Sequence, residues 1–287
     1  MTLAPRDEMI PDMGVTRRHI SAITGKTIVG VAISVAALLL IVGGLVYDHN
    51  RSRPDSTAPQ VTPPTTEAPG PMPPLLAVVG DSYSGGSDMG GRGAQNWLPL
   101  LAKNLDYLPC GFPVGGSGWT SGRSGFTFGA RVDWAVDLDP DVIIFFNGVN
   151  DLKSPTTQAG RDADAALSNL RAKDPDVPVV VIGPVLVQDT SAAKTTEMAN
   201  GIRAATLKHD AFWVDPVAEG WFAGPDRALI GSDRFHPTNE GMAYLSRKIE
   251  KSLTVLNLDN LPERQRDYWA CNVPTVPDPT TPTTPPQ

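Results

Sequence analysis

Leu75-Leu-Ala-Val-Val-Gly-Asp-Ser-Tyr-Ser84 is the stretch of sequence from which the fold can be inferred. Its first six residues carry no charged side chain, and polar side chains follow at once from Asp81 onward. A strand that is apolar along its whole length, rather than at alternate residues, is typical of a parallel sheet that is covered on both faces. We therefore predict a buried strand over residues 75–80 that ends in a polar loop.

Further runs along the chain have the same character. Residues 142–147, 179–183 and 212–215 are rich in Val, Ile and Phe, and residues 107–112 form a weaker candidate strand. Apolar stripes at helical spacing lie between or after these runs: Trp97, Leu98, Leu101 and Leu105; Ala163, Ala166, Leu167 and Leu170; Met242, Leu245, Ile249 and Leu253. The alternation predicts an α/β fold over residues 75–272, a flavodoxin-like three-layer sandwich around a central, mostly parallel five-stranded sheet.

Polar motifs stand at the ends of the predicted strands. Gly80-Asp81-Ser82 follows the first strand, and Gly148-Val149-Asn150-Asp151 follows the strand at 142–147. Asp233-Arg-Phe-His236 comes just before the last helical stripe. Because ligands of open α/β sheets bind beyond the carboxyl ends of the strands, these motifs are the candidates for a functional site.

The order and placement of these motifs resemble those of the SGNH (GDSL-like) hydrolase family, whose four blocks contribute Ser, Gly, Asn and His. The resemblance extends from residue 75 to about residue 256. It implies Ser82 as the nucleophile, His236 as general base and then general acid, and Asp233 as the group that orients the imidazole. One departure is Tyr83, because the GDSL motif has Leu at this position, and we expect it to affect substrate preference more than catalysis.

The second block of the family is matched by Ser117-Gly118-Trp119-Thr120, which is similar to the family pattern Ser-Gly-x-Thr. The resemblance then implies an oxyanion hole made of the backbone N–H groups of Ser82 and Gly118 and the side-chain amide of Asn150. It also implies structural roles for two carboxylates. Asp81 is expected to bond backbone amides around the nucleophile, and Asp151 to hold the loop that carries Asn150.

Composition and spacing argue against several other classes of function. The net charge of −7 and the pI near 5.1 do not fit a protein that binds nucleic acid or other polyanions. No His/Cys/Asp cluster has metal-ligand spacing, and the glycines near residues 85–93 lack the lysine of a phosphate-binding loop, so neither a metal nor a cofactor is expected.

Aromatic residues in the predicted loops allow two interpretations. They could line a cleft, where they would suit an acyl chain or the faces of sugar rings, or they could simply pack the loops against the core. The residues concerned are Trp119, Phe126, Phe128, Trp221 and Phe222.

The N-terminal region predicts a membrane anchor. Residues 28–47 carry no charged side chain, and about 20 such residues suffice to cross a bilayer as a helix. A cleaved signal peptide is the alternative, but the run is long for one and lacks a clear small-x-small cleavage site. We predict a cytoplasmic segment at 1–26, a transmembrane helix at 27–47, and a hydrolase domain outside the cytoplasm, since more basic residues precede the span than follow it.

Segments rich in Pro and Thr flank the predicted domain. Residues 48–74 are expected to form an extended linker, and residues 273–287 a disordered tail. Cys110 and Cys271 are the only cysteines, and both fall on the predicted outer side. In an oxidising compartment an even pair favours a disulfide, with two buried thiols as the alternative.

The sequence therefore predicts a serine esterase that hydrolyses carboxylic esters, such as O-acyl glycans or lipid esters of the cell envelope, through an acyl-enzyme. Its expected partners are an ester substrate and, through one N-terminal helix, a membrane. An O-acyltransferase with the same triad and a catalytically silent envelope-binding module are the alternatives. The presence of a single predicted span favours hydrolysis, because a multi-span module to deliver an acyl donor is lacking. The oligomeric state is left open.

Overall fold

The computed structural model describes residues 70–122, 125–187, 190–266 and Cys271. At its centre is a parallel five-stranded sheet of order β3-β2-β4-β5-β6. The strands are β2 (Leu75–Gly80), β3 (Leu108–Pro113), β4 (Val142–Phe146), β5 (Val179–Ile182) and β6 (Phe212–Val214). This order is that of flavodoxin-like sheets, and it confirms the predicted α/β class with all five strands parallel.

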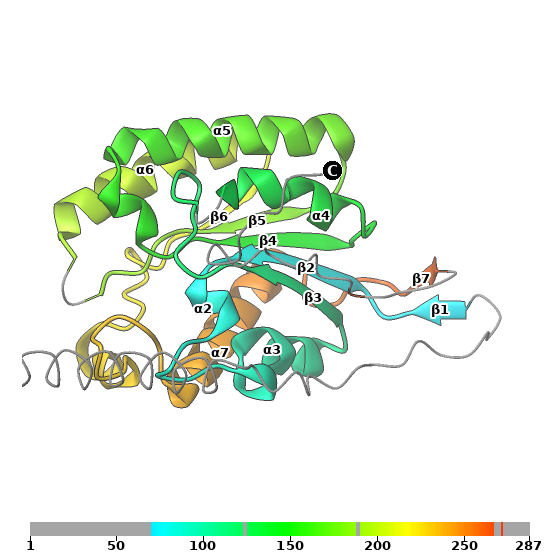
Figure 1. Cartoon of the computed structure of the whole chain (residues 1–287). Coiled ribbons are helices and arrows are strands. Elements are labelled where there is room, and N and C mark those ends of the chain that lie inside the picture. Colours follow the sequence, from blue (N-terminus) through cyan, green and yellow to red (C-terminus); the bar gives the residue numbers. More distant parts are fainter. Residues whose placement is uncertain (1–69, 123–124, 188–189, 267–270, 272–287) are drawn as a thin grey trace, which may run out of the picture. The chain divides into compact units, whose positions relative to one another are not determined.

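Helices cover both faces of the sheet (Figure 1). One face is packed by α3 (Trp97–Leu105) and α7 (Asn239–Val255), which correspond to two of the predicted apolar stripes. The other face is packed by α4 (Val132–Val136), α5 (Thr156–Lys173) and α6 (Ala192–Lys208). Every residue of β2, β4 and β5 is buried, which explains why these strands read as uninterrupted apolar runs.

Helix α6 was not predicted, because its buried face is built largely of small and polar residues. Ala199, Ala205, Thr195 and Thr206 are all buried there, so the apolar stripe is faint in the sequence. Helices α5 and α6 run side by side (Figure 1). At Gly160 a Cβ atom would lie 2.8 Å from the backbone of Gly201, so this close approach requires glycine.

A two-stranded antiparallel ribbon joins the two ends of the described fold. In it β1 (Gly70–Met72) pairs with β7 (Arg264–Arg266), so the fold begins inside the segment 48–74 that was predicted as linker. Arg266 forms an ion pair with Asp141 at 2.7 Å, and both side chains are nearly buried. The predicted disulfide between Cys110 and Cys271 is present and ties the chain beyond β7 to strand β3.

Short helical segments complete the path of the chain. They are α2 (Ser82–Gly85), η1 (Gly93–Gln95), η3 (Gly129–Arg131), η4 (Asn150–Lys153) and η5 (Gly224–Leu229). The predicted cytoplasmic segment, the predicted transmembrane helix at 27–47, most of the linker and the tail at 273–287 lie outside the described residues. Within the described part of the chain, no helix combines the length and apolarity that a membrane crossing needs.

Candidate active site

The nucleophile candidate stands where β2 ends. Ser82 is the first residue of α2, and the carboxylate of Asp81 caps this helix by accepting the N–H of Tyr83 at 2.8 Å. The strand-to-helix turn therefore presents the Ser82 hydroxyl at the carboxyl edge of the sheet. Among the described residues, none accepts a hydrogen bond from the backbone N–H of Ser82, so this donor is available to a ligand.

The structure brings together the three residues of the predicted triad. His236 Nε2 lies 2.9 Å from Ser82 Oγ, and His236 Nδ1 lies 2.6 Å from Asp233 Oδ2. Slight burial raises the pKa of Asp233, but hydrogen bonds from the backbone and ring of His236 outweigh this effect and hold the pKa below its usual value. Asp233 is thus ionised at neutral pH and can stabilise a protonated imidazole.

A closed loop carries the base and its carboxylate partner. Ile230 and Pro237 form a bridge that closes the loop, and the N–H of Gly231 donates to His236 O at 2.8 Å. Within the loop, Asp233 Oδ1 accepts the N–H groups of Phe235 and His236, each at 2.9 Å. The same carboxylate therefore folds the loop with one oxygen and orients the imidazole with the other.

Two of the predicted oxyanion donors lie beside the nucleophile turn, but both are hydrogen-bonded within the protein. The N–H of Gly118 donates to Ser121 O at 2.7 Å. The amide of Asn150 donates to Asp81 Oδ2 at 2.8 Å and to Ser117 O at 2.9 Å. Their role as oxyanion donors stays a prediction, because it requires these bonds to be exchanged for bonds to a ligand.

The carboxylate of Asp151 holds a different loop from the one expected. It accepts three backbone N–H groups, at 2.7 to 3.2 Å, from Trp119, Thr120 and Ser121. A Cβ atom on Gly118 would lie 2.4 Å from this carboxylate, so only glycine fits. Asp151 therefore organises the loop of the second block, because η4 directs its side chain across to that loop rather than back onto its own.

Asp81 bonds backbone amides around the nucleophile, as expected. Besides capping α2, it accepts the N–H of Gly148 at 3.0 Å. Complete burial raises the pKa of the Asp81 carboxyl to about 6. Its hydrogen bonds and its electrostatic interactions with His236 and Arg131 act in the opposite direction.

Arg131 is a buried cation that the sequence analysis missed. Its side chain is 0% exposed, and its guanidinium donates to Gly80 O at 2.8 Å, to Ser117 Oγ at 2.6 Å and to Phe112 O. Burial lowers the pKa of Arg131 to about 10, so the group remains charged at neutral pH. It connects the ends of β2 and β3 to the loop of the second block, and nothing in its local sequence distinguishes it from a surface arginine.

The aromatic residues that could have lined a cleft are mostly packed in the core. Four of them are at most 2% exposed: Trp119, Phe128, Trp221 and Phe222. Phe126 is half-buried, with its ring 5.6 Å from that of Trp134. For the four buried residues the packing interpretation is correct, because their rings fill the two hydrophobic layers beside the sheet.

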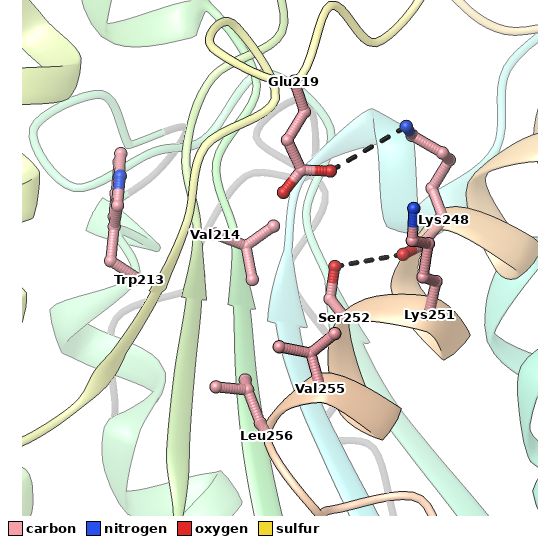
Figure 2. Close-up of a pocket in the computed structure, with 8 residues that line it drawn as sticks. All are labelled: Trp213, Val214, Glu219, Lys248, Lys251, Ser252, Val255 and Leu256. Carbon is pink, nitrogen blue, oxygen red and sulfur yellow. Dashed lines mark hydrogen bonds and ion pairs between the residues drawn. The ribbon is translucent and has the colours of Figure 1, made fainter.

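Two hollows of the described structure are lined by residues other than the triad. One, of about 380 Å³, adjoins Trp119 and the face of α5 that carries Asp162. The other, of about 350 Å³, lies along the edge strand β6 and α7 (Figure 2). Lys248 approaches Glu219 within it at 3.8 Å. Neither is lined by a residue of the triad, and no group of three metal-ligating side chains occurs in the residues that the structure describes.

Comparisons with known proteins agree with this geometry. Residues 78–244 match the model of the GDSL-like Lipase/Acylhydrolase family. GDSL lipase Rv0518 of Mycobacterium tuberculosis is 30% identical over 185 residues, which cover 61% of this chain and 79% of the relative.

Solved structures share the fold at low sequence identity. A family two carbohydrate esterase from Clostridium thermocellum superposes with a TM-score of 0.54 at 16% identity, over 67% of each chain. The esterase EstA from Pseudoalteromonas gives a TM-score of 0.53 at 13% identity, over 64% of this chain and 98% of its own.

Proposed function

Because this chain belongs to the GDSL-like lipase/acylhydrolase family and is an ester-hydrolysing enzyme, we propose that it works as a serine esterase through an acyl-enzyme on Ser82. The observation that carries the proposal is the hydrogen-bonded chain from Ser82 Oγ through His236 to Asp233. A hydroxyl, a base within 2.9 Å and a carboxylate behind the base are the parts that nucleophilic catalysis by serine requires.

In the proposed mechanism His236 Nε2 takes the proton of Ser82 as Oγ attacks the ester carbonyl. The ionised Asp233 stabilises the imidazolium, and the backbone N–H of Ser82 donates to the developing oxyanion. His236 then gives the proton to the departing alcohol, which leaves an acyl ester on Ser82. Water, deprotonated by His236, attacks this ester and releases the acid, so that the enzyme returns to its starting state.

We propose esters of the cell envelope as substrates, either O-acyl glycans or lipid esters. The proposal is supported by the disulfide, which fits an oxidising compartment outside the cytoplasm. The carbohydrate esterase from Clostridium thermocellum has the same fold, so this architecture accommodates esters of sugars. The buried aromatic residues contribute no argument for either substrate.

For the N-terminal region we propose one membrane-spanning helix at residues 27–47, with the N-terminus in the cytoplasm and the enzyme outside. The support is the sequence alone, namely the uncharged run and the basic residues before it. Protease added to intact cells or spheroplasts is expected to release the region after Asn50. Complete protection of that region would reverse the orientation.

The decisive experiment is the turnover of p-nitrophenyl acetate and butyrate by the full chain and by its Ser82→Ala variant. We expect clear turnover by the native chain and background rates for the variant, because the variant lacks the nucleophile. Background rates for both proteins would move the assignment to an envelope-binding module. Transfer of the acyl group to an added sugar in preference to water would instead identify an acyltransferase.

A further inference from the structure

Tyr83 follows the nucleophile and departs from the GDSL motif, in which this position is Leu. From the sequence, this departure was expected to affect substrate preference. In the structure the side chain of Tyr83 is 0% exposed, so it offers no surface to a substrate. A different role has to account for the phenol.

The hydroxyl of Tyr83 reaches the loop that carries the base. It donates to the carbonyl oxygen of Phe235 at 2.6 Å, across 152 residues of sequence. The ring packs edge-on against Phe146, with centroids 5.8 Å apart, and lies 6.2 Å from the ring of His236. A leucine could fill the same space but could not donate this hydrogen bond. The bond therefore joins the residue after the nucleophile to the residue before the base.

The bond acts on the peptide group between Phe235 and His236. This group is planar and rigid, and its carbonyl and N–H point in opposite directions. Tyr83 holds the carbonyl, and Asp233 Oδ1 accepts the N–H of His236 at 2.9 Å. The carbonyl and the N–H of this peptide group are thus both held by hydrogen bonds, and the Cα of His236 lies in the same plane.

The middle of the loop that carries the base is exposed to solvent. Ser232, Asp233 and Arg234 are exposed, and Arg234 has a φ of 61°, a left-handed conformation that is uncommon outside glycine. Burial raises the pKa of Tyr83 well above its ordinary value, so its hydroxyl keeps its proton and remains a donor. The Tyr83 hydroxyl can therefore donate this bond at neutral pH and above it.

We infer that Tyr83 is a positioning residue whose hydroxyl holds the Phe235–His236 peptide, and thereby keeps His236 Nε2 within hydrogen-bond distance of Ser82 Oγ. The inference rests on the proposed function, since this distance matters only if the imidazole moves the proton of Ser82. Proton transfer is sensitive to such placement, because displacements of a fraction of an ångström lower the rate. The effect should fall on the chemical step and leave substrate binding unchanged.

The test compares Tyr83→Phe with Tyr107→Phe in the full chain. Tyr107 is a matched control, because its ring is also buried and its hydroxyl also donates to a distant carbonyl, Leu258 O, at 2.8 Å. For p-nitrophenyl butyrate we expect Tyr83→Phe to lower kcat about tenfold and to keep KM within about twofold of the native value. Tyr107→Phe should keep the native kcat, although it loses two hydrogen bonds, to Leu258 O and from the N–H of Leu261, whereas Tyr83→Phe loses one.

A second measurement reports on the position of the His236 imidazole and does not depend on catalytic turnover. The proton shared by His236 Nδ1 and Asp233 gives a low-field NMR resonance, which Tyr83→Phe should shift or broaden and Tyr107→Phe should leave in place. A native kcat or a raised KM in Tyr83→Phe, or an equal loss of kcat in Tyr107→Phe, would overturn the inference. If the native chain and the Ser82→Ala variant both showed only background activity, the proposed function would be overturned instead. The NMR resonance would then be the measurement that tests whether Tyr83 positions His236.

Discussion

Replacing Arg131 with Met should show how strongly the site depends on one buried cation. Methionine keeps the apolar contacts of the arginine stem, but it ends about where the guanidinium begins and has no donor and no charge. The substitution removes every hydrogen bond of the guanidinium group, to Gly80 O, Phe112 O, Ser117 Oγ and Thr127 O. It also removes a positive charge that favours the ionised form of Asp81.

The structure sets the size of the expected loss. A buried acceptor that loses its donor costs about 1 to 3 kcal/mol. The loss is partial for Gly80 O, which still accepts the N–H of Val114 at 3.0 Å, and for Ser117 Oγ, which still donates to Val114 O at 2.6 Å. We therefore expect the free energy of unfolding to fall by about 3 kcal/mol, at the upper end of ordinary single substitutions. The loop of the second block also loses its tie to the nucleophile turn, so kcat should fall about tenfold.

Urea denaturation followed by tryptophan fluorescence measures the first quantity, and initial rates with p-nitrophenyl butyrate measure the second. Arg171→Met is the control, because Arg171 also donates to backbone carbonyls, among them Val177 O at 2.7 Å and His209 O at 2.9 Å, but lies at the far end of α5. The control should lose about 1 kcal/mol and keep its kcat. Native stability and native kcat in Arg131→Met would refute the reasoning.

Three further predictions concern the triad, the predicted oxyanion donor and the buried carboxylate. Ser82→Ala and His236→Ala should each remove most esterase activity, and the double variant should lose little more, since both act as one unit; additive losses would contradict this. Asn150→Ala should lower kcat by about 10² to 10³ with little change in KM, whereas a large change in KM alone would reassign Asn150 to substrate binding. The pKa of Asp81 is raised from 3.8 to about 6, so the folded state binds more protons and this group stabilises the fold less as the pH rises. As the pH rises from 4.5 to 7, the free energy of unfolding of Asp81→Asn should therefore increase by about 2 kcal/mol relative to that of the native chain. Urea denaturation at several pH values measures this difference, and a difference that does not change with pH would contradict the prediction.

The parts of the fold that were predicted from sequence are those with strong local signals. Strand β2 has the predicted bounds, β4, β5 and β6 each end one residue before the predicted end, and β3 is shifted by one residue at both ends. Strands β2, β4 and β5 gave a strong signal because strands buried on both faces are apolar throughout. The ribbon of β1 and β7 gave no such signal. Its strands contain Pro71 and the charged residues Arg264 and Arg266, and they are stabilised by partners nearly 200 residues apart in sequence.

The same distinction holds within the candidate site. Ser82, Asn150 and His236 could be proposed from the sequence because they stand in short motifs near the predicted ends of elements, where sequence neighbours indicate the chemistry. Arg131 and the bond from Tyr83 to Phe235 were not found, because their meaning depends on carbonyl groups that only the folded chain brings near. A backbone acceptor carries no side-chain signature, so residues that act through such acceptors escape motif analysis.

The hydrogen bonds of Asn150 indicate how the site responds to a substrate. Its amide has two hydrogens, and both are donated within the protein, one to the carboxylate of Asp81 and one to Ser117 O. A hydrogen bond to a charged acceptor is about twice as strong as one to a neutral acceptor. The bond to Ser117 O is therefore the one that an oxyanion would displace, because the exchange replaces a neutral acceptor with a charged one. The gain arises only as negative charge develops, so Asn150 would stabilise the transition state more than the bound ester, which is the condition for raising kcat.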